Sequence, residues 1–179
     1  MKGAHLAIAV AKATGIPLKL AGEVQPLFKS YFDSEIKPHL DGKFIEYIGE
    51  ADLAAKNELL GHSMAMLFPI QWNEPFGLVM IEAMACGTPV IGLRRGSVAE
   101  VISDGISGYV CETVDQMIDR VRNLTIKPAS TRAYVEKKFS VEVMVEKYLH
   151  LYKSIAGPAA LGAGAPNQIA AMAGPGAAA

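Results

Sequence analysis

Short apolar runs alternate with longer segments of helical periodicity along most of the chain. The run at residues 64–70 is apolar throughout, which is typical of a central parallel strand that is covered on both faces. Regular alternation of this kind predicts βα units that build one parallel sheet between layers of helices. The five predicted strands are residues 17–21, 43–48, 64–70, 89–93 and 107–111.

The segments between these runs predict helices, and two further helices follow the last strand. The final one carries an apolar stripe at helical spacing, which we expect to be partly exposed here or covered by another chain. The residues of that stripe are Val141, Met144, Val145, Tyr148, Leu149, Tyr152 and Ile155. The predicted helices are residues 5–13, 24–39, 53–61, 77–86, 98–103, 115–123, 129–138 and 141–155.

The two ends of the chain depart from this pattern. Residues 157–179 are almost entirely Ala, Gly and Pro, which predicts a disordered tail after a domain at residues 1–156. Only residues 1–4 precede the first helix, so the strand that normally opens a doubly wound fold is expected to be missing. That strand would be central, so strands 17–21 and 64–70 should either pair directly or leave a gap.

Composition excludes several functions. Lysine plus arginine (17) nearly balances aspartate plus glutamate (18), so we expect no nucleic-acid partner. The two cysteines, Cys86 and Cys111, lack metal-binding spacing and indicate buried thiols of a cytoplasmic protein. No apolar run reaches the roughly 20 residues that span a bilayer. We therefore expect a soluble, cytoplasmic chain that holds any anion locally, although the full-length enzyme could lie peripherally on a membrane.

The most informative stretch is residues 67–92, LFPIQWNEPFGLVMIEAMACGTPVIG. A buried strand ends near Ile70 and a helix begins near Gly77, which places the helix N-terminus at the ligand-binding edge of the sheet. Free main-chain N–H groups at a helix N-terminus form an anion site suited to phosphate. Glu74 and Glu82 stand on either side of this point with seven residues between them. Carboxylates accept paired hydrogen bonds from vicinal sugar hydroxyls, so a sugar and a ribose are candidate ligands.

These residues resemble those of a known enzyme family. EPFGL at 74–78 followed by EAMACGTPV at 82–90 is similar to the E-x7-E region of the retaining glycosyltransferases of family four. The similarity continues through Gly96, Glu100, Val101, Asp104, Gly105 and Gly108. The resemblance implies the GT-B fold, in which two Rossmann-like domains face a cleft, with this chain as the C-terminal, donor-binding domain.

The resemblance also implies roles for single residues. Glu74 would contact the transferred sugar and is the candidate catalytic residue, and Glu82 would hold the ribose hydroxyls. The main chain of Phe76, Gly77 and Leu78 would contact the diphosphate. No metal or other cofactor is implied, since cations and a helix N-terminus stabilise the leaving diphosphate.

Further donor-binding residues follow from the same resemblance. Lys2 looks like the lysine of the family's "GR…KG" element, whose arginine this chain lacks. Gly22 and residues 48–51 correspond to the lining of the donor and base pockets, and Lys56 would reach the base. Ser97 replaces a usual glycine, a departure that we expect to be minor, and the acceptor-binding domain is missing.

Simpler interpretations remain for several of these residues. Glu74 would be favourable near a helix N-terminus for electrostatic reasons alone. Lys2 could be a solvated terminal lysine, and a surface position is favoured for Lys56. For Arg94 and Arg95 an exposed basic loop is favoured over a place in the cleft.

Two functions therefore compete. The first is the nucleotide-sugar-binding domain of a glycosyltransferase, which would be inactive without its acceptor domain. The second is a non-catalytic module that binds a nucleotide or a nucleotide-sugar. A dinucleotide-dependent oxidoreductase is disfavoured because no G-x-G-x-x-G opens the first βα unit.

Overall fold

A computed structural model describes residues 2–156 of the chain. These residues belong to two compact units, Met1–Ser140 and a second that begins at Val141, and each is described by itself. The predicted tail at residues 157–179 lies outside the described residues.

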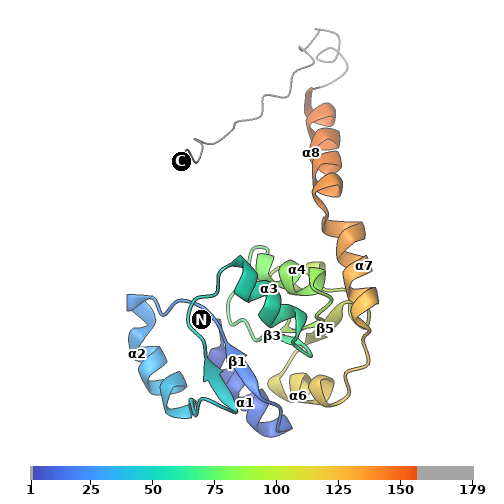
Figure 1. Ribbon diagram of the computed structural model, residues 1–179. Helices are drawn as coiled ribbons and strands as arrows, with labels where there is room; N and C mark the ends of the chain where they lie inside the picture. Colours follow the sequence, from blue (N-terminus) through green and yellow to red (C-terminus); the bar gives the residue numbers. More distant parts are fainter. Residues whose placement is uncertain (1, 157–179) are drawn as a thin grey trace, which may run out of the picture. The chain divides into compact units, whose positions relative to one another are not determined.

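All five predicted strands are confirmed, and every pairing between them is parallel (Figure 1). They form two sheets, one with the order β1-β2 and one with the order β3-β4-β5. In the second sheet, Ile91 of the central strand pairs with Leu67 on one side and with Tyr109 on the other. The strands are β1 (Leu18–Leu20), β2 (Ile45–Tyr47), β3 (Met66–Phe68), β4 (Val90–Leu93) and β5 (Gly108–Cys111).

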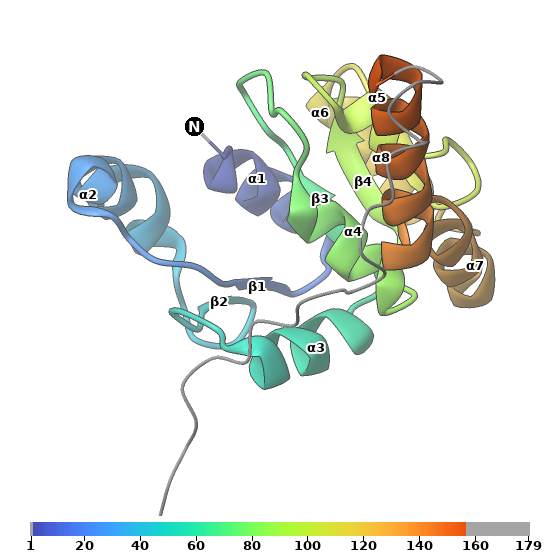
Figure 2. The ribbon, with the colours of Figure 1, turned by 90° about the horizontal axis from the view of Figure 1, so that it is seen from above.

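Between β1 and β3 the structure has the gap that the sequence allowed as one of two outcomes (Figure 2). Helix α1 (Ala4–Thr14) connects the two sheets by its packing. Its Val10 is buried in a cluster with Ile91 of β4, and its Ile8 is buried with Ile45 of β2. One helix thus contributes to the cores under both sheets.

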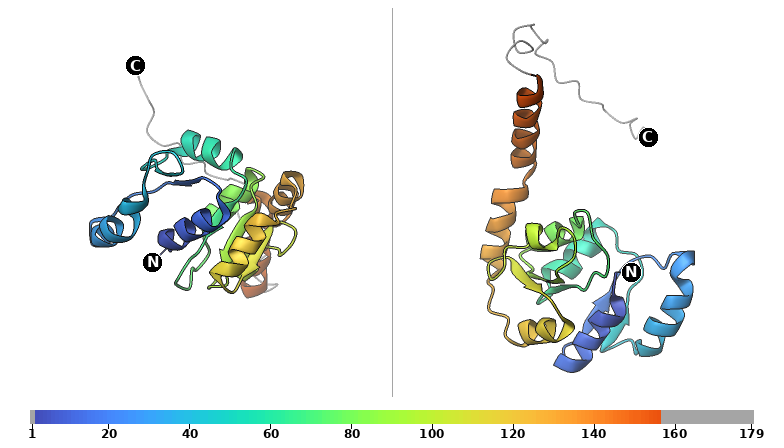
Figure 3. Two further views of the ribbon diagram at one scale, coloured as in Figure 1. Left: turned by 90° about the horizontal axis from the view of Figure 1, so that it is seen from below. Right: turned by 180° about the vertical axis from the view of Figure 1, so that it is seen from behind.

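The remaining regular helices fall into two groups around the strands (Figure 3). Helix α6 packs on α1, whereas α4 packs on both α3 and α7. Each corresponds to a predicted helix, and α5 ends two residues before its predicted end. Their bounds are α3 (Leu53–Gly61), α4 (Leu78–Ala85), α5 (Val98–Val101), α6 (Val114–Arg122) and α7 (Pro128–Phe139).

The prediction of one continuous helix over residues 24–39 is wrong. The structure has four short pieces there: η1 (Pro26–Phe28), α2 (Lys29–Tyr31), the π-helical η2 (Phe32–Ile36) and η3 (Lys37–His39). Two prolines explain the interruption, because proline has no N–H to donate and its ring disfavours a continuing α-helix. Pro26 lies at the start of η1 and Pro38 lies in η3.

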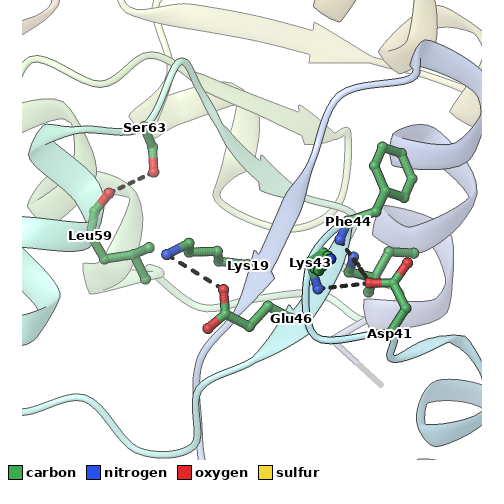
Figure 4. A network of polar contacts seen from close by, with 8 residues as sticks. Lys19, Asp41, Lys43, Phe44, Glu46, Leu59 and Ser63 are labelled. Atoms are coloured by element: carbon green, nitrogen blue, oxygen red, sulfur yellow. Dashed lines mark hydrogen bonds and ion pairs between the residues drawn. The ribbon is translucent and has the colours of Figure 1, made fainter.

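Polar contacts fix the turn that leads into β2 (Figure 4). The Asp41 carboxylate accepts hydrogen bonds from the main-chain N–H groups of Lys43, Phe44 and Ile45, at 2.9, 2.7 and 3.0 Å. Lys19 of β1 and Glu46 of β2 form an ion pair across the strands, with 3.5 Å between nitrogen and oxygen. The turn and the pair set β2 in register with β1.

The second unit contains helix α8 (Val141–Ala156), which confirms the predicted helix. Its apolar stripe lies on one helical face, and the rings of Tyr148 and Tyr152 are 6.0 Å apart. What covers this stripe stays a prediction. No helix within residues 2–156 combines the length and apolar character needed to cross a bilayer.

Candidate functional site

The loop between β3 and α4 carries the centre of the predicted site. Gly77 stands immediately before α4 with φ 76° and ψ 63°. This is a left-handed conformation that residues other than glycine rarely adopt. A Cβ atom at this position would lie 2.6 Å from the Cε atom of Met80, which is fully buried. The start of α4 therefore requires glycine chiefly for its left-handed conformation, since the Met80 methyl group is the end of a flexible side chain.

Glu74 lies beside this helix start. A Cβ atom built on Gly77 would be 3.3 Å from the Cγ atom of Glu74, so the two residues are in contact. Glu74 is half-buried. The structure thus places the predicted sugar-binding carboxylate at the N-terminus of α4.

A second helix start lies at the same edge of the sheet. Gly3, which precedes α1, is buried and has φ 79°. A Cβ atom on Gly3 would overlap the carbonyl oxygen of Pro69, the residue that follows β3. The exposed Lys2 therefore stands beside the loop that leads to Glu74 and α4.

The starts of α1 and α4 differ from those of α3 and α6. Asp52 caps α3 by accepting a hydrogen bond from the N–H of Ala55, and Thr113 caps α6 by accepting one from Gln116. The residues at the starts of α1 and α4, Gly3 and Gly77, provide no side-chain cap. Their first N–H groups are among those that a helix cannot satisfy internally and that attract anions.

At α1 one of these N–H groups has a partner from another element. The hydroxyl of Tyr31 accepts a hydrogen bond from the N–H of His5 at 3.2 Å, and it also contacts Nδ1 of His5 at 2.8 Å. A cavity of about 550 Å³ opens here, lined by His5, Ser30, Tyr31, Ser34 and Glu35. The start of α4 is therefore more available than the start of α1 for binding an anion.

Glu82 points from α4 towards α3, where it meets Lys56. The Lys56 Nζ atom and the Glu82 Oε1 atom are 2.6 Å apart, and 30% and 39% of the two side chains are exposed. The resemblance predicted that Lys56 reaches the base of the nucleotide. The structure instead pairs Lys56 with Glu82, the carboxylate predicted to hold the ribose hydroxyls. A carboxylate has a second oxygen and further lone pairs, so Glu82 can still accept hydrogen bonds from a ligand.

Gly22 lies at the carboxyl end of the other sheet. Its N–H donates to the carbonyl of Gly49 at 2.8 Å, and its own carbonyl accepts from the hydroxyl of Tyr47 at 2.6 Å. The structure thus brings Gly22 together with the segment 48–51, which the resemblance assigned to the base pocket.

The predicted diphosphate contact of Phe76 and Leu78 involves their main chain, and their side chains have other surroundings. The Phe76 ring packs edge-on against Phe139 of α7, with 6.2 Å between the ring centroids. Leu78 is 67% exposed. Their contribution to a diphosphate site would come from the main chain.

Arg94 and Arg95 are both exposed, as expected for a basic loop. Arg94 forms an ion pair with Glu112, and an Arg95 nitrogen donates to the Arg94 carbonyl. Among residues 2–156, no group of histidine, cysteine and acidic side chains is arranged to hold a metal ion.

Ser97 is the residue whose importance sequence reasoning underestimated. Its N–H donates to the carbonyl of Glu74 and its hydroxyl donates to the carbonyl of Phe76, each at 2.9 Å. Ser97 therefore holds the loop that carries the predicted catalytic glutamate. A buried serine in place of a family glycine was the available signal.

Comparison with known families gives one match that spans most of the chain. The family model described as "Glycosyl transferases group 1" matches residues 1–140. The chain is 35% identical over 126 residues to N-acetyl-alpha-D-glucosaminyl L-malate synthase of Bacillus anthracis, an alignment that covers 65% of this chain and 32% of that protein. It is 30% identical over 146 residues to an uncharacterised 41.2 kDa protein in the cps region of Klebsiella pneumoniae, covering 76% of this chain and 40% of the relative.

Solved structures with the same α/β fold are GT-B glycosyltransferases. AviGT4, a glycosyltransferase involved in avilamycin A biosynthesis, superimposes with a TM-score of 0.69 and 29% identity, covering 86% of this chain and 48% of that one. Anabaena HepE in complex with UDP and glucose gives a TM-score of 0.72 at 21% identity, over 86% of this chain and 45% of HepE. At that identity the HepE structure establishes the fold alone. The chain thus spans less than half of these relatives.

Proposed function

Since the chain belongs to the glycosyl transferases group 1 family, we propose that residues 2–140 form the nucleotide-sugar-binding part of a retaining glycosyltransferase. One observation carries the proposal: two glycine-started helices begin beside the end of β3, Gly3 against Pro69 and Gly77 near Phe68, next to a loop that bears a carboxylate. Oxygen-rich anions with attached hydroxyls fit this combination.

The diphosphate would lie between the starts of α4 and α1. Main-chain N–H groups of Gly77 and Leu78 would donate to it, with the Lys2 ammonium nearby. During transfer the bond between the sugar and the diphosphate breaks, and negative charge grows on the departing diphosphate. N–H groups and a cation fixed around that charge lower the barrier because they need no reorganisation.

The two glutamates would hold the two sugars of the donor. Glu82 would accept hydrogen bonds from the ribose hydroxyls while Lys56 keeps one of its oxygens engaged. Glu74 would contact the transferred sugar, whose anomeric carbon bonds to an acceptor oxygen as the acceptor proton leaves. The acceptor site would lie on a second domain, so we propose that transfer requires that domain.

A second candidate is a binding module without catalysis. The chain covers 32% of its B. anthracis relative and 45% of HepE, and a donor-binding domain acting on its own would suit such a module. Such a module would bind a nucleotide-sugar as described and leave it intact.

Binding is tested by titrating UDP, GDP and ADP into the wild type and into Glu82→Ala by calorimetry. We expect at least one diphosphate to bind the wild type, and Glu82→Ala to bind it about 10- to 100-fold more weakly, as loss of charge-assisted hydrogen bonds predicts. Glu136→Ala is the control, because Glu136 forms only an exposed pair with Arg132 of α7. Equal affinity in wild type and Glu82→Ala would refute the ribose contact.

The 2′-deoxy form of the preferred diphosphate sharpens this result. It should bind the wild type more weakly than the ribose form, and Glu82→Ala should not distinguish the two. Adding a separately produced acceptor domain and measuring sugar transfer then separates the two candidate functions. Transfer supports the enzyme, and intact donor in every combination supports the module.

A further inference from the structure

Ser97 joins two separate segments of the proposed donor site. It is 7% exposed and donates two hydrogen bonds to one loop, from its N–H to the Glu74 carbonyl and from its Oγ to the Phe76 carbonyl, both at 2.9 Å. Its own carbonyl accepts from the N–H groups of Glu100 and Val101 at the start of α5. Ser97 is therefore anchored in α5 and fixes the loop before α4.

The neighbouring glycine makes a contact that no side chain would allow. Gly96 has φ 51°, and a Cβ atom there would lie 2.5 Å from the Glu74 nitrogen and 2.8 Å from the Asn73 carbonyl carbon. Real Cβ atoms essentially never approach main-chain atoms this closely. The main chains of the two segments are thus in direct contact at Glu74.

The hydrogen bond from the Ser97 hydroxyl to the Phe76 carbonyl also affects Gly77. In a trans peptide the C=O and the following N–H point in opposite directions. Holding the Phe76 carbonyl towards Ser97 therefore turns the Gly77 N–H away from Ser97. That N–H belongs to the group proposed to bind the diphosphate.

We propose that Gly96 and Ser97 are positioning residues of the donor site, which set the Glu74 main chain and the direction of the Gly77 N–H. This inference rests on the proposed function and adds to it a determinant of diphosphate binding on the loop between β4 and α5. The Ser97 side chain acts through Phe76 and does not contact the ligand.

The test compares UDP with UMP, because only UDP carries the second phosphate that the Gly77 N–H would meet. In Ser97→Ala we expect UDP affinity to fall about five-fold, as loss of one positioning hydrogen bond predicts, with UMP affinity unchanged. Ser97→Thr retains the hydroxyl and should restore most of the preference for UDP. Equal loss for UDP and UMP would indicate a merely structural role and overturn the proposal.

Ser63→Ala is the matched control for this variant. The Ser63 hydroxyl also donates to a main-chain carbonyl, that of Leu59 at 2.6 Å, but it lies at the end of α3. Its replacement should change neither affinity. A fall in the UDP preference for Ser63→Ala as large as that for Ser97→Ala would overturn the specific role of Ser97.

Gly96→Ala and Gly105→Ala form a second matched pair. Both glycines have positive φ, 51° and 75°, but space around Gly105 is open. We expect Gly96→Ala to lose more UDP affinity than Ser97→Ala, and Gly105→Ala to keep the wild-type value. If Gly96→Ala does not fold, the Ser97 series decides. A wild type that binds none of UDP, GDP and ADP overturns the proposed function as well. If another base is preferred, its diphosphate and monophosphate replace UDP and UMP, and binding that Ser97→Ala leaves unchanged overturns this inference alone.

Discussion

Helices α3 and α6 start differently from helices α1 and α4. The starts of α5 and α7, at Ser97 and Lys127, also lack a side-chain cap but have no glycine. Helices α3 and α6 begin at Asp52 and Thr113, whose side chains accept a hydrogen bond from the first turn. Helices α1 and α4 begin at Gly3 and Gly77, which have no side chain to offer. Replacing a capping Ser, Thr, Asp or Asn by alanine costs about 1 kcal/mol, whereas glycine at the same position costs about a few tenths, so a glycine start is a small local loss of stability. We propose that the glycine starts serve a ligand and that the capped starts serve the fold.

Among the variants that test this comparison, Gly77→Ala should have the largest effect on UDP affinity. The new methyl group would meet the Met80 side chain at 2.6 Å and force a left-handed conformation on alanine. Displacing the start of α4 should weaken UDP binding about 30-fold or more, an effect of about 2 kcal/mol. Calorimetric titration measures the affinity.

Gly15→Ala is the control for that variant. Gly15 has φ 71° and open space around it, at the opposite end of α1. It should lower the unfolding temperature slightly and leave UDP affinity unchanged. If Gly77→Ala binds UDP as well as Gly15→Ala does, the start of α4 is not the diphosphate site.

Lys56→Met tests what the capped helix α3 contributes to the site through Glu82. The substitution removes the partner of Glu82 and keeps most of the side-chain length. We expect UDP affinity to fall about three- to ten-fold, because Glu82 loses a charge-assisted hydrogen bond that orients it. In the Glu82→Ala background the same substitution should have little effect. Additive losses in the double variant would show that Lys56 acts on the ligand independently of Glu82.

Thr113→Ala tests the other side of the comparison. Removing the cap of α6 should lower the free energy of unfolding by about 1 kcal/mol, which chemical denaturation measures. UDP affinity should not change, because α6 contributes no residue to the proposed site. A loss of affinity without a loss of stability would contradict the division between the two kinds of helix start.

The smallest expected effect concerns Asp41, whose carboxylate satisfies three main-chain N–H groups. The N–H groups of Lys43, Ile45 and Phe44 lower its pKa in the folded state. A lowered folded-state pKa stabilises the fold above the unfolded value of about 3.9, and this stabilisation is lost as the pH falls through the folded value. The unfolding temperature of Asp41→Asn should therefore fall less than that of the wild type between about pH 5 and about pH 3. Parallel curves for both proteins would argue against this contribution.

Regular hydrophobic patterns made much of the fold predictable. Each apolar run became a strand, and the glycine at the start of α4 could be located because it follows a buried strand and precedes an apolar helix. The prediction of one helix over residues 24–39 relied on the spacing of apolar residues. It gave too little weight to Pro26 and Pro38, which interrupt a regular α-helix.

Long-range contacts within the site were not predictable from patterns. Lys56 and Glu82 are far apart in sequence, and nothing in their spacing shows that α3 and α4 bring them together. The two bonds from Ser97 to the Glu74 loop likewise depend on the packing of α5. Resemblance predicted residues of a donor site, whereas the contacts that join them could be seen only in the structure.

The most direct test of a ligand site at the glycine starts is to follow main-chain amide NMR signals while UDP is added. The amides of Gly77 and Leu78, with those around Gly3, should shift or broaden in proportion to bound UDP. The amides at the capped starts, Ala55 and Gln116, should move far less. Shifts that leave Gly77 and Leu78 unchanged, or an absence of any change with UDP, GDP and ADP alike, would contradict the account.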